Sequence, residues 1–130
     1  MKHRIEIAKE YDSDDLVDLL ATAMCGCSYW CSELDYDDNE YKEARAKLIK
    51  NGNNEPCYED ILVEMLESGK SLYWVDCEDN TSNELTLEKL LNGIRLNAEN
   101  RPHDCDLESG DAETMDCIIQ YALFDDVIFG

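Results

Sequence analysis

Residues 57–77, CYEDILVEMLESGKSLYWVDC, contain a helix and a strand that together decide the fold class. The apolar residues of the first half recur at helical spacing: Ile61, Leu62, Met65 and Leu66. This pattern predicts a helix over 57–68, with Gly69 at its end. Residues 70–77 combine β-branched and aromatic side chains, which predicts a strand. A helix followed directly by a strand indicates a fold that mixes both kinds of element.

The same criteria predict further elements on both sides of this segment. The expected helices cover 14–25, 40–50, 57–68, 86–100 and 112–124, and the expected strands cover 2–8, 28–34, 70–77 and 127–129. The residues expected to cap or open these helices are Ser13, Asn39, Pro56, Thr86 and Asp111. We therefore expect a single compact α+β domain over residues 1–130, in which four or five helices pack on a small, mainly antiparallel sheet.

The chain is strongly acidic without being polar throughout. It carries 31 Asp and Glu against 11 Lys and Arg, a formal charge of −20, and 44% of its 130 residues are hydrophobic. Duplex DNA carries one charge per about 1.7 Å, so this charge corresponds to about 34 Å of duplex. A compact domain of this length has a radius of gyration of about 14 Å and a diameter of about 35 Å. The folded protein is therefore about as negative as DNA of its own length, although solubility alone also explains acidic surfaces.

The cysteines indicate a reducing compartment. They number seven: Cys25, Cys27, Cys31, Cys57, Cys77, Cys105 and Cys117. Because the count is odd and the N-terminal residues lack an apolar export signal, we expect free thiols and a cytoplasmic protein. No stretch approaches the roughly 18 apolar residues of a membrane span, so we expect no membrane contact.

The strongest metal candidate is Cys25-x-Cys27-x3-Cys31, with His103 and Cys105 as further ligands. Zinc sites usually pair their cysteines with two to four residues between them, so the Cys25–Cys27 spacing is unusual. Free Cys side chains also behave as small apolar residues in protein interiors. We therefore expect free thiols and no metal.

Asp35-x-Asp37-x-Asn39 begins like a calcium-binding loop. The EF-hand pattern requires Gly at its sixth position and Glu at its twelfth, where this chain has Glu40 and Ala46. These departures exclude an EF-hand and leave weak surface binding of calcium as the alternative.

Catalytic signatures are missing from the sequence. It contains no Gly-rich phosphate loop, no H-E-x-x-H and no G-x-S-x-G, and only His3 and His103 could serve as histidine bases. We therefore expect a protein that is not an enzyme and needs no cofactor.

Two dense acidic runs are the candidate partner-binding residues. The first run consists of Asp35, Tyr36, Asp37, Asp38, Glu40, Tyr41 and Glu43, and the second of Asp104, Asp106, Glu108, Asp111 and Glu113. Their carboxylates would stand in for phosphates, and exposed Tyr36 and Tyr41 would anchor Lys or Arg side chains through cation–π contacts. The partner expected from this chemistry is a basic protein surface rather than nucleic acid. Trp30 and Trp74 are instead expected in the core.

Three segments resemble a group of small proteins encoded by prophages and conjugative elements of Gram-positive bacteria. These are residues 28–31 (SYWC), 85–94 (LTLEKLLNGI) and 118–130 (IIQYALFDDVIFG). The resemblance covers about half of the chain, and its motifs are core-like. It implies a mobile-element accessory protein. Small acidic proteins of that origin include anti-CRISPR and anti-restriction inhibitors, several of which mimic DNA.

Three functional hypotheses follow. The favoured one is an inhibitor, monomeric or homodimeric, that occupies the basic nucleic-acid-binding cleft of a defence nuclease such as a CRISPR effector in the host cytoplasm. The second is an accessory protein that binds a host or phage factor without DNA mimicry. The third is a small enzyme or sequestering protein that acts on a defence signal, which the net charge of −20 disfavours because such signals are anionic.

Overall fold

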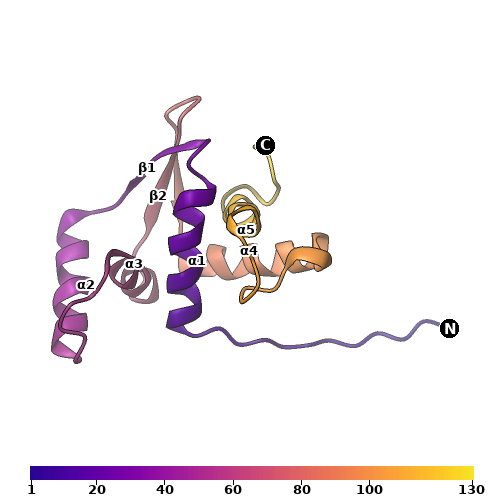
Figure 1. The fold of residues 1–130 in the computed structure, drawn as a ribbon, viewed down its shortest axis with the longest axis horizontal. Helices are drawn as coiled ribbons and strands as arrows, with labels where there is room; N and C mark the ends of the chain where they lie inside the picture. The colour runs from indigo at the N-terminus through magenta and orange to yellow at the C-terminus, as the bar shows by residue number, and fades with distance from the viewer.

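The computed structural model describes residues 1–130 and contains five α-helices and a three-stranded antiparallel sheet (Figure 1). The elements are α1 (Ser13–Gly26), β1 (Cys31–Asp35), α2 (Asp38–Lys50), α3 (Tyr58–Glu67), β2 (Leu72–Asp76), β3 (Ser82–Leu85), α4 (Leu87–Asn100), the 3₁₀ turn η1 (Pro102–Asp104) and α5 (Ala112–Phe124). The predicted α+β class is confirmed.

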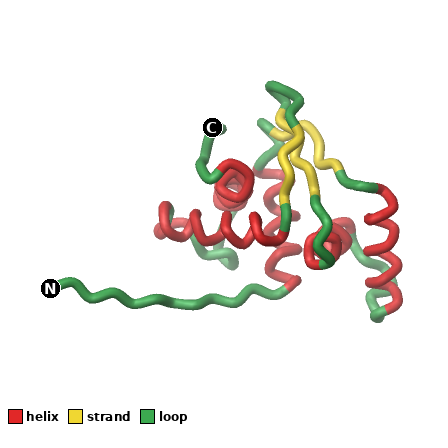
Figure 2. Tube along the Cα trace, turned by 180° about the vertical axis from the view of Figure 1, so that it is seen from behind, coloured by secondary structure: helices red, strands yellow, loops and turns green.

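The helices pack in a row beside the small sheet. α2 packs on α3, α3 on α1, α1 on α5 and α5 on α4, so α1 lies in the middle of the row (Figures 1 and 2). The strand order is β1-β2-β3, with Trp74 of β2 opposite Leu34 of β1 and Asn83 of β3. One helical row and one sheet therefore share a single core.

Both tryptophans lie in that core, as predicted. Trp30 and Trp74 are each 1% exposed, and their rings are stacked with centroids 6.3 Å apart. Phe129, near the C-terminus, also stacks on Trp30, with centroids 4.9 Å apart. The indole therefore joins β2 to the residues that follow α5.

A buried carboxylate organises the same region. Asp116 of α5 is 5% exposed and accepts hydrogen bonds from Tyr29 Oη at 2.7 Å and Trp30 Nε1 at 2.8 Å. Gln120 Nε2 donates a third bond to Asp116 at 2.9 Å. Because Asp116 has no ion-pair partner, these donors are what satisfies its carboxylate in the interior.

Gln120 also explains why the terminal strand predicted at 127–129 is wrong. Its Oε1 accepts the backbone N–H groups of Ile128 and Phe129, both at 2.8 Å. A side chain thereby satisfies donors that a neighbouring strand would otherwise take. Phe129 packs on the core without entering the sheet, whereas Ile128 is exposed.

The strand predicted at 2–8 is also wrong. Residues 1–10 are extended and exposed, and no strand pairs with them. The sheet instead contains β3, whose residues Ser82, Asn83 and Glu84 are too polar to have predicted a strand. Its position at the sheet edge explains that composition.

Two of the four predicted N-caps are confirmed. Thr86 accepts the N–H of Lys89, and Asp111 accepts that of Thr114. The predictions for the other two helices are wrong by one or two residues. The caps are Asp12 in place of Ser13 and Asp37 in place of Asn39, while Pro56 lies before the helix that it was expected to open.

Candidate partner-binding surface

The first acidic run lies at the end of β1 and in the first turns of α2. Asp35 ends β1, and Asp38, Glu40 and Glu43 belong to α2. Asp37 caps α2, because its Oδ1 accepts the N–H groups of Asn39 at 2.9 Å and Glu40 at 3.0 Å. A carboxylate at this position stabilises the helix N-terminus. Asp37 is therefore required for local structure, whatever else it contacts.

Positive charges lie close to this run. The remainder of α2 carries four cations: Lys42, Arg45, Lys47 and Lys50. Glu40 also lies 3.7 Å from the ammonium of Lys70, and Lys47 pairs with Glu64 at 2.7 Å. The first run therefore belongs to a surface of mixed charge and is a poorer imitation of a phosphate backbone than its sequence suggests.

The two tyrosines of the first run pack together. Tyr36 and Tyr41 are stacked with ring centroids 5.0 Å apart, and Tyr58 lies 6.1 Å from each. All three are half-buried, so the prediction that Tyr36 and Tyr41 are exposed is wrong. Burial raises the pKa of Tyr58, and its hydrogen bond to Tyr36 raises it further. Burial likewise raises the pKa of Tyr41.

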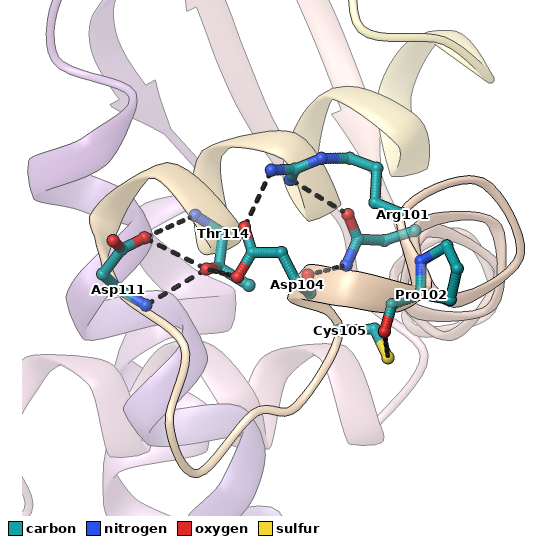
Figure 3. Close-up of polar contacts among 7 residues, drawn as sticks. Arg101, Pro102, Asp104, Cys105, Asp111 and Thr114 are labelled. Carbon is teal, nitrogen blue, oxygen red and sulfur yellow. Dashed lines mark hydrogen bonds and ion pairs between the residues drawn. The ribbon is translucent and has the colours of Figure 1, made fainter.

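Two acids of the second run hold their own loop together (Figure 3). Asp104 pairs with Arg101 at 2.7 Å and accepts the hydroxyl of Thr114 at 2.6 Å. Asp111 accepts the Thr114 N–H at 3.0 Å at the start of α5. That backbone donor, together with the Thr114 hydroxyl, lowers the pKa of Asp111 below its usual value. Asp104 and Asp111 thus bind the segment that connects η1 to α5.

The other acids of the second run are exposed, and two of them lie beside α1. Glu108 lines a hollow of about 170 Å³ together with Asp15 and Asp18. Asp106 and Glu108 line a neighbouring hollow of about 250 Å³, again with Asp15. Glu113 is exposed in the first turn of α5. The fold therefore brings the second run beside α1, which the loop before α5 approaches in Figure 1.

We name Asp15, Asp18, Asp106 and Glu108 the α1 face. Lys9 is the one basic residue that lines either hollow. The sequence contains the signal that predicts this surface, because neither residues 10–41 nor residues 102–130 include a single Lys or Arg. The α1 face does not appear as a dense acidic run in the sequence, since Asp15 and Asp18 are spaced along a helix.

The first and second acidic runs do not form one surface. α2 lies at one end of the helical row, whereas the second run lies beyond α1, with α3 and α1 between them (Figures 1 and 2). A partner that contacts the α1 face therefore meets the second run and α1, not the first run.

The cysteines do not converge on a ligand set. All seven are free, with Cys25 exposed, Cys27 buried and Cys31 half-buried. Burial, followed by the nearby Asp116 carboxylate, raises the pKa of Cys27 and keeps its thiol protonated. No group of three or more His, Cys, Asp or Glu side chains is arranged to hold a metal ion.

Comparison with protein-family models, with curated proteins and with solved structures finds no match for this chain. None of its helices combines the length and apolar character needed to cross a bilayer.

Proposed function

We propose that this protein is a mobile-element inhibitor that occupies the basic nucleic-acid-binding cleft of a bacterial defence nuclease, with a CRISPR effector as the favoured target. The observation that carries the proposal is the α1 face, where four carboxylates from two distant segments gather with one neighbouring cation. The protein acts there by binding alone, in the host cytoplasm, without catalysis or cofactor.

Most of the charge is free to act on a partner. Only six of the 31 carboxylates belong to an ion pair, and in four of those six pairs both side chains are at least 32% exposed. The resulting field repels nucleic acid and attracts basic protein surfaces, which accelerates association. An inhibitor that competes with DNA for a cationic cleft requires a surface that attracts the protein and repels the DNA.

The acids divide into two groups with different roles. Asp37 and Asp111 cap helices, and Asp104 joins Arg101 to Thr114, so their loss damages the fold before it reveals any binding role. Asp18 and Glu108 are exposed and make no side-chain hydrogen bond or ion pair. Substitution of Asp18 and Glu108 therefore tests binding with the least disturbance of the fold.

The decisive experiment measures inhibition of a purified CRISPR effector nuclease and competition with its DNA. The Asp18→Lys, Glu108→Lys double variant should weaken binding by roughly tenfold or more, since facing charges in a cleft contribute strongly to affinity. Binding should also weaken steeply as salt is raised.

The matched control is the Glu33→Lys, Glu88→Lys double variant. It changes the net charge by the same amount at exposed acids on β1 and α4. The control should retain nearly all inhibition. Equal losses in both variants would show that net charge alone matters, and simultaneous binding of DNA and this protein would refute mimicry.

A second candidate is an accessory protein that binds a host or phage factor without imitating DNA. The mixed surface of α2 favours it, because Lys42, Arg45 and Lys50 lie beside the first acidic run without forming ion pairs. Such a surface suits a partner of mixed charge. A complex that survives the α1-face variant and is lost on charge reversal at Lys42 and Arg45 supports this alternative.

A further inference from the structure

The first ten residues form an arm that contacts little of the domain. Every residue from Met1 to Glu10 is exposed, and Ile5 and Ile7 are 82% and 74% exposed. The side chains alternate between apolar and polar along 2–8, which is the pattern of a strand with one buried face. The arm therefore has the sequence of a paired strand and no strand beside it.

The arm lies along α4 and leaves a gap between them. The gap has a volume of about 730 Å³ and is lined by Ile5 and Ile7 on the arm and by Leu91, Ile94 and Ala98 on α4. Leu91 is 43% exposed although it belongs to a helix of the domain. Figures 1 and 2 show the arm running beside α4 and projecting beyond the domain. Apolar side chains thus form both walls of an open groove.

We propose that two copies of this chain exchange arms in a symmetric dimer, so that the arm of each copy packs on α4 of the other. In the dimer, Ile5 and Ile7 of each copy contact Leu91 and Ile94 of the other. The two arms run side by side, so each supplies the strand partner that the other lacks. One self-complementary surface on both copies is the arrangement that two-fold symmetry requires.

The charges favour this occupant. Residues 2–9 carry Lys2, Arg4 and Lys9 against one acid, Glu6, in a chain whose overall charge is −20. The groove continues at Tyr11 and Cys105 into the hollow lined by acids of the α1 face. A second arm therefore brings positive charge to a negative region, which offsets part of the repulsion between two acidic domains.

The lengths also match. Eight extended residues span about 26 Å at roughly 3.3 Å per residue. The 14 residues of α4 span about 21 Å at 1.5 Å per residue. An arm can therefore cover the whole of α4 and place both isoleucines within the groove.

Sedimentation equilibrium of the full chain at moderate salt tests the proposal. The unaltered protein should dimerise as its concentration rises, and the Ile5→Asp, Ile7→Asp variant should remain monomeric over the same range. Ile128→Asp is the control, because it places a negative charge on an exposed apolar residue elsewhere. A monomer at every concentration, or a dimer that survives both arm substitutions, would overturn the inference.

Disulfide trapping distinguishes exchange from an arm that folds back on its own domain. Ile7 and Cys105 line the same groove, and the native Cys105 is free, so Ile7→Cys places a second thiol in that groove. Exchange predicts a covalent dimer on a non-reducing gel, which disappears when Cys105→Ser is added. A bond between these two positions that forms only within single chains would overturn the inference, whatever the mass in solution.

Discussion

Gly93 of α4 lies directly against Ala122 of α5. A Cβ placed on Gly93 would be 2.7 Å from the Ala122 Cβ and 2.6 Å from the carbonyl oxygen of Ile118. The backbones of the two helices therefore approach closely at this position. This explains a glycine in the middle of a helix, where it otherwise costs roughly 1 kcal/mol relative to Ala.

The Gly93→Ala variant should be less stable, contrary to its higher helix propensity. Overpacking of a filled contact costs roughly 1–3 kcal/mol, which exceeds the gain of about 1 kcal/mol from the better helix former. Urea unfolding followed by circular dichroism measures the difference. Ala98→Gly, at an exposed position of the same helix, is the control and should cost about 1 kcal/mol. A more stable Gly93→Ala protein would contradict the close approach.

Loss of the buried carboxylate should be among the most damaging single changes. In Asp116→Ala, the donors of Tyr29, Trp30 and Gln120 lose their shared acceptor. Trp30 Nε1 and Gln120 Nε2 are buried, and each buried donor left without a partner costs roughly 1–3 kcal/mol, so the free energy of unfolding should fall by about 2–5 kcal/mol. Asp18→Ala, an exposed acid, should change it by less than about 0.5 kcal/mol. Similar effects of the two substitutions would rule out a structural role for the network.

Asp111 should contribute stability that disappears in acid. Its pKa lies below the ordinary value of 3.8 because the Thr114 N–H, and then its hydroxyl, stabilise the carboxylate. A lowered folded-state pKa means that the contribution is complete above the unfolded pKa and is lost as pH falls through the folded pKa. Asp111→Asn should therefore be less stable than the natural protein at neutral pH, and the difference should close below about pH 3.8.

Urea unfolding at a series of pH values checks this prediction. Asp111→Ala is the control, because it lacks any cap acceptor and should be less stable than the natural protein at every pH. If the difference in free energy of unfolding between Asp111→Asn and the natural protein stays constant in acid, the carboxylate charge does not stabilise the helix.

The melting temperature should rise with salt. Raising the ionic strength from about 0.01 M to about 0.15 M shortens the Debye length from roughly 30 Å to roughly 8 Å, which screens repulsion among the carboxylates. Modest acidification from neutral pH should act in the same direction until capping acids protonate. The Asp18→Lys, Glu108→Lys variant carries less net charge, so its melting temperature should depend less on salt. A melting temperature that is flat or falls with salt would show that repulsion is insignificant.

The helices could be predicted because each carries its own periodic apolar stripe. The inward face of α1 is visible in the spacing of Leu16, Leu19, Leu20 and Ala23, all of which are buried. The sequence does not distinguish the capping residue, since Asp12 and Ser13 are neighbours and both can accept a backbone N–H. Strand pairing is harder still, because alternation in residues 2–8 says nothing about whether another strand is present.

The candidate surface was only partly predictable for a related reason. The second run is visible in the sequence because its acids lie close together along the chain. Its proximity to Asp15 and Asp18 depends on the packing of α1 against α5. Asp37 and Asp104 also form structural hydrogen bonds, with the Asn39 N–H and the Thr114 hydroxyl, that a count of charges does not reveal. Charge runs predict where acids are dense, whereas tertiary contacts decide which acids remain free.

The network around Trp30 also sets the order in which a newly made chain can fold. The acceptor of its indole, Asp116, is synthesised 86 residues later. At about 5–20 residues per second, a ribosome needs roughly 4–17 s to reach it. During that interval Trp30 lacks the helix and the Phe129 ring that enclose it, so the growing chain exposes apolar surface. The excess of Asp and Glu in the chain opposes contact between such unfinished copies.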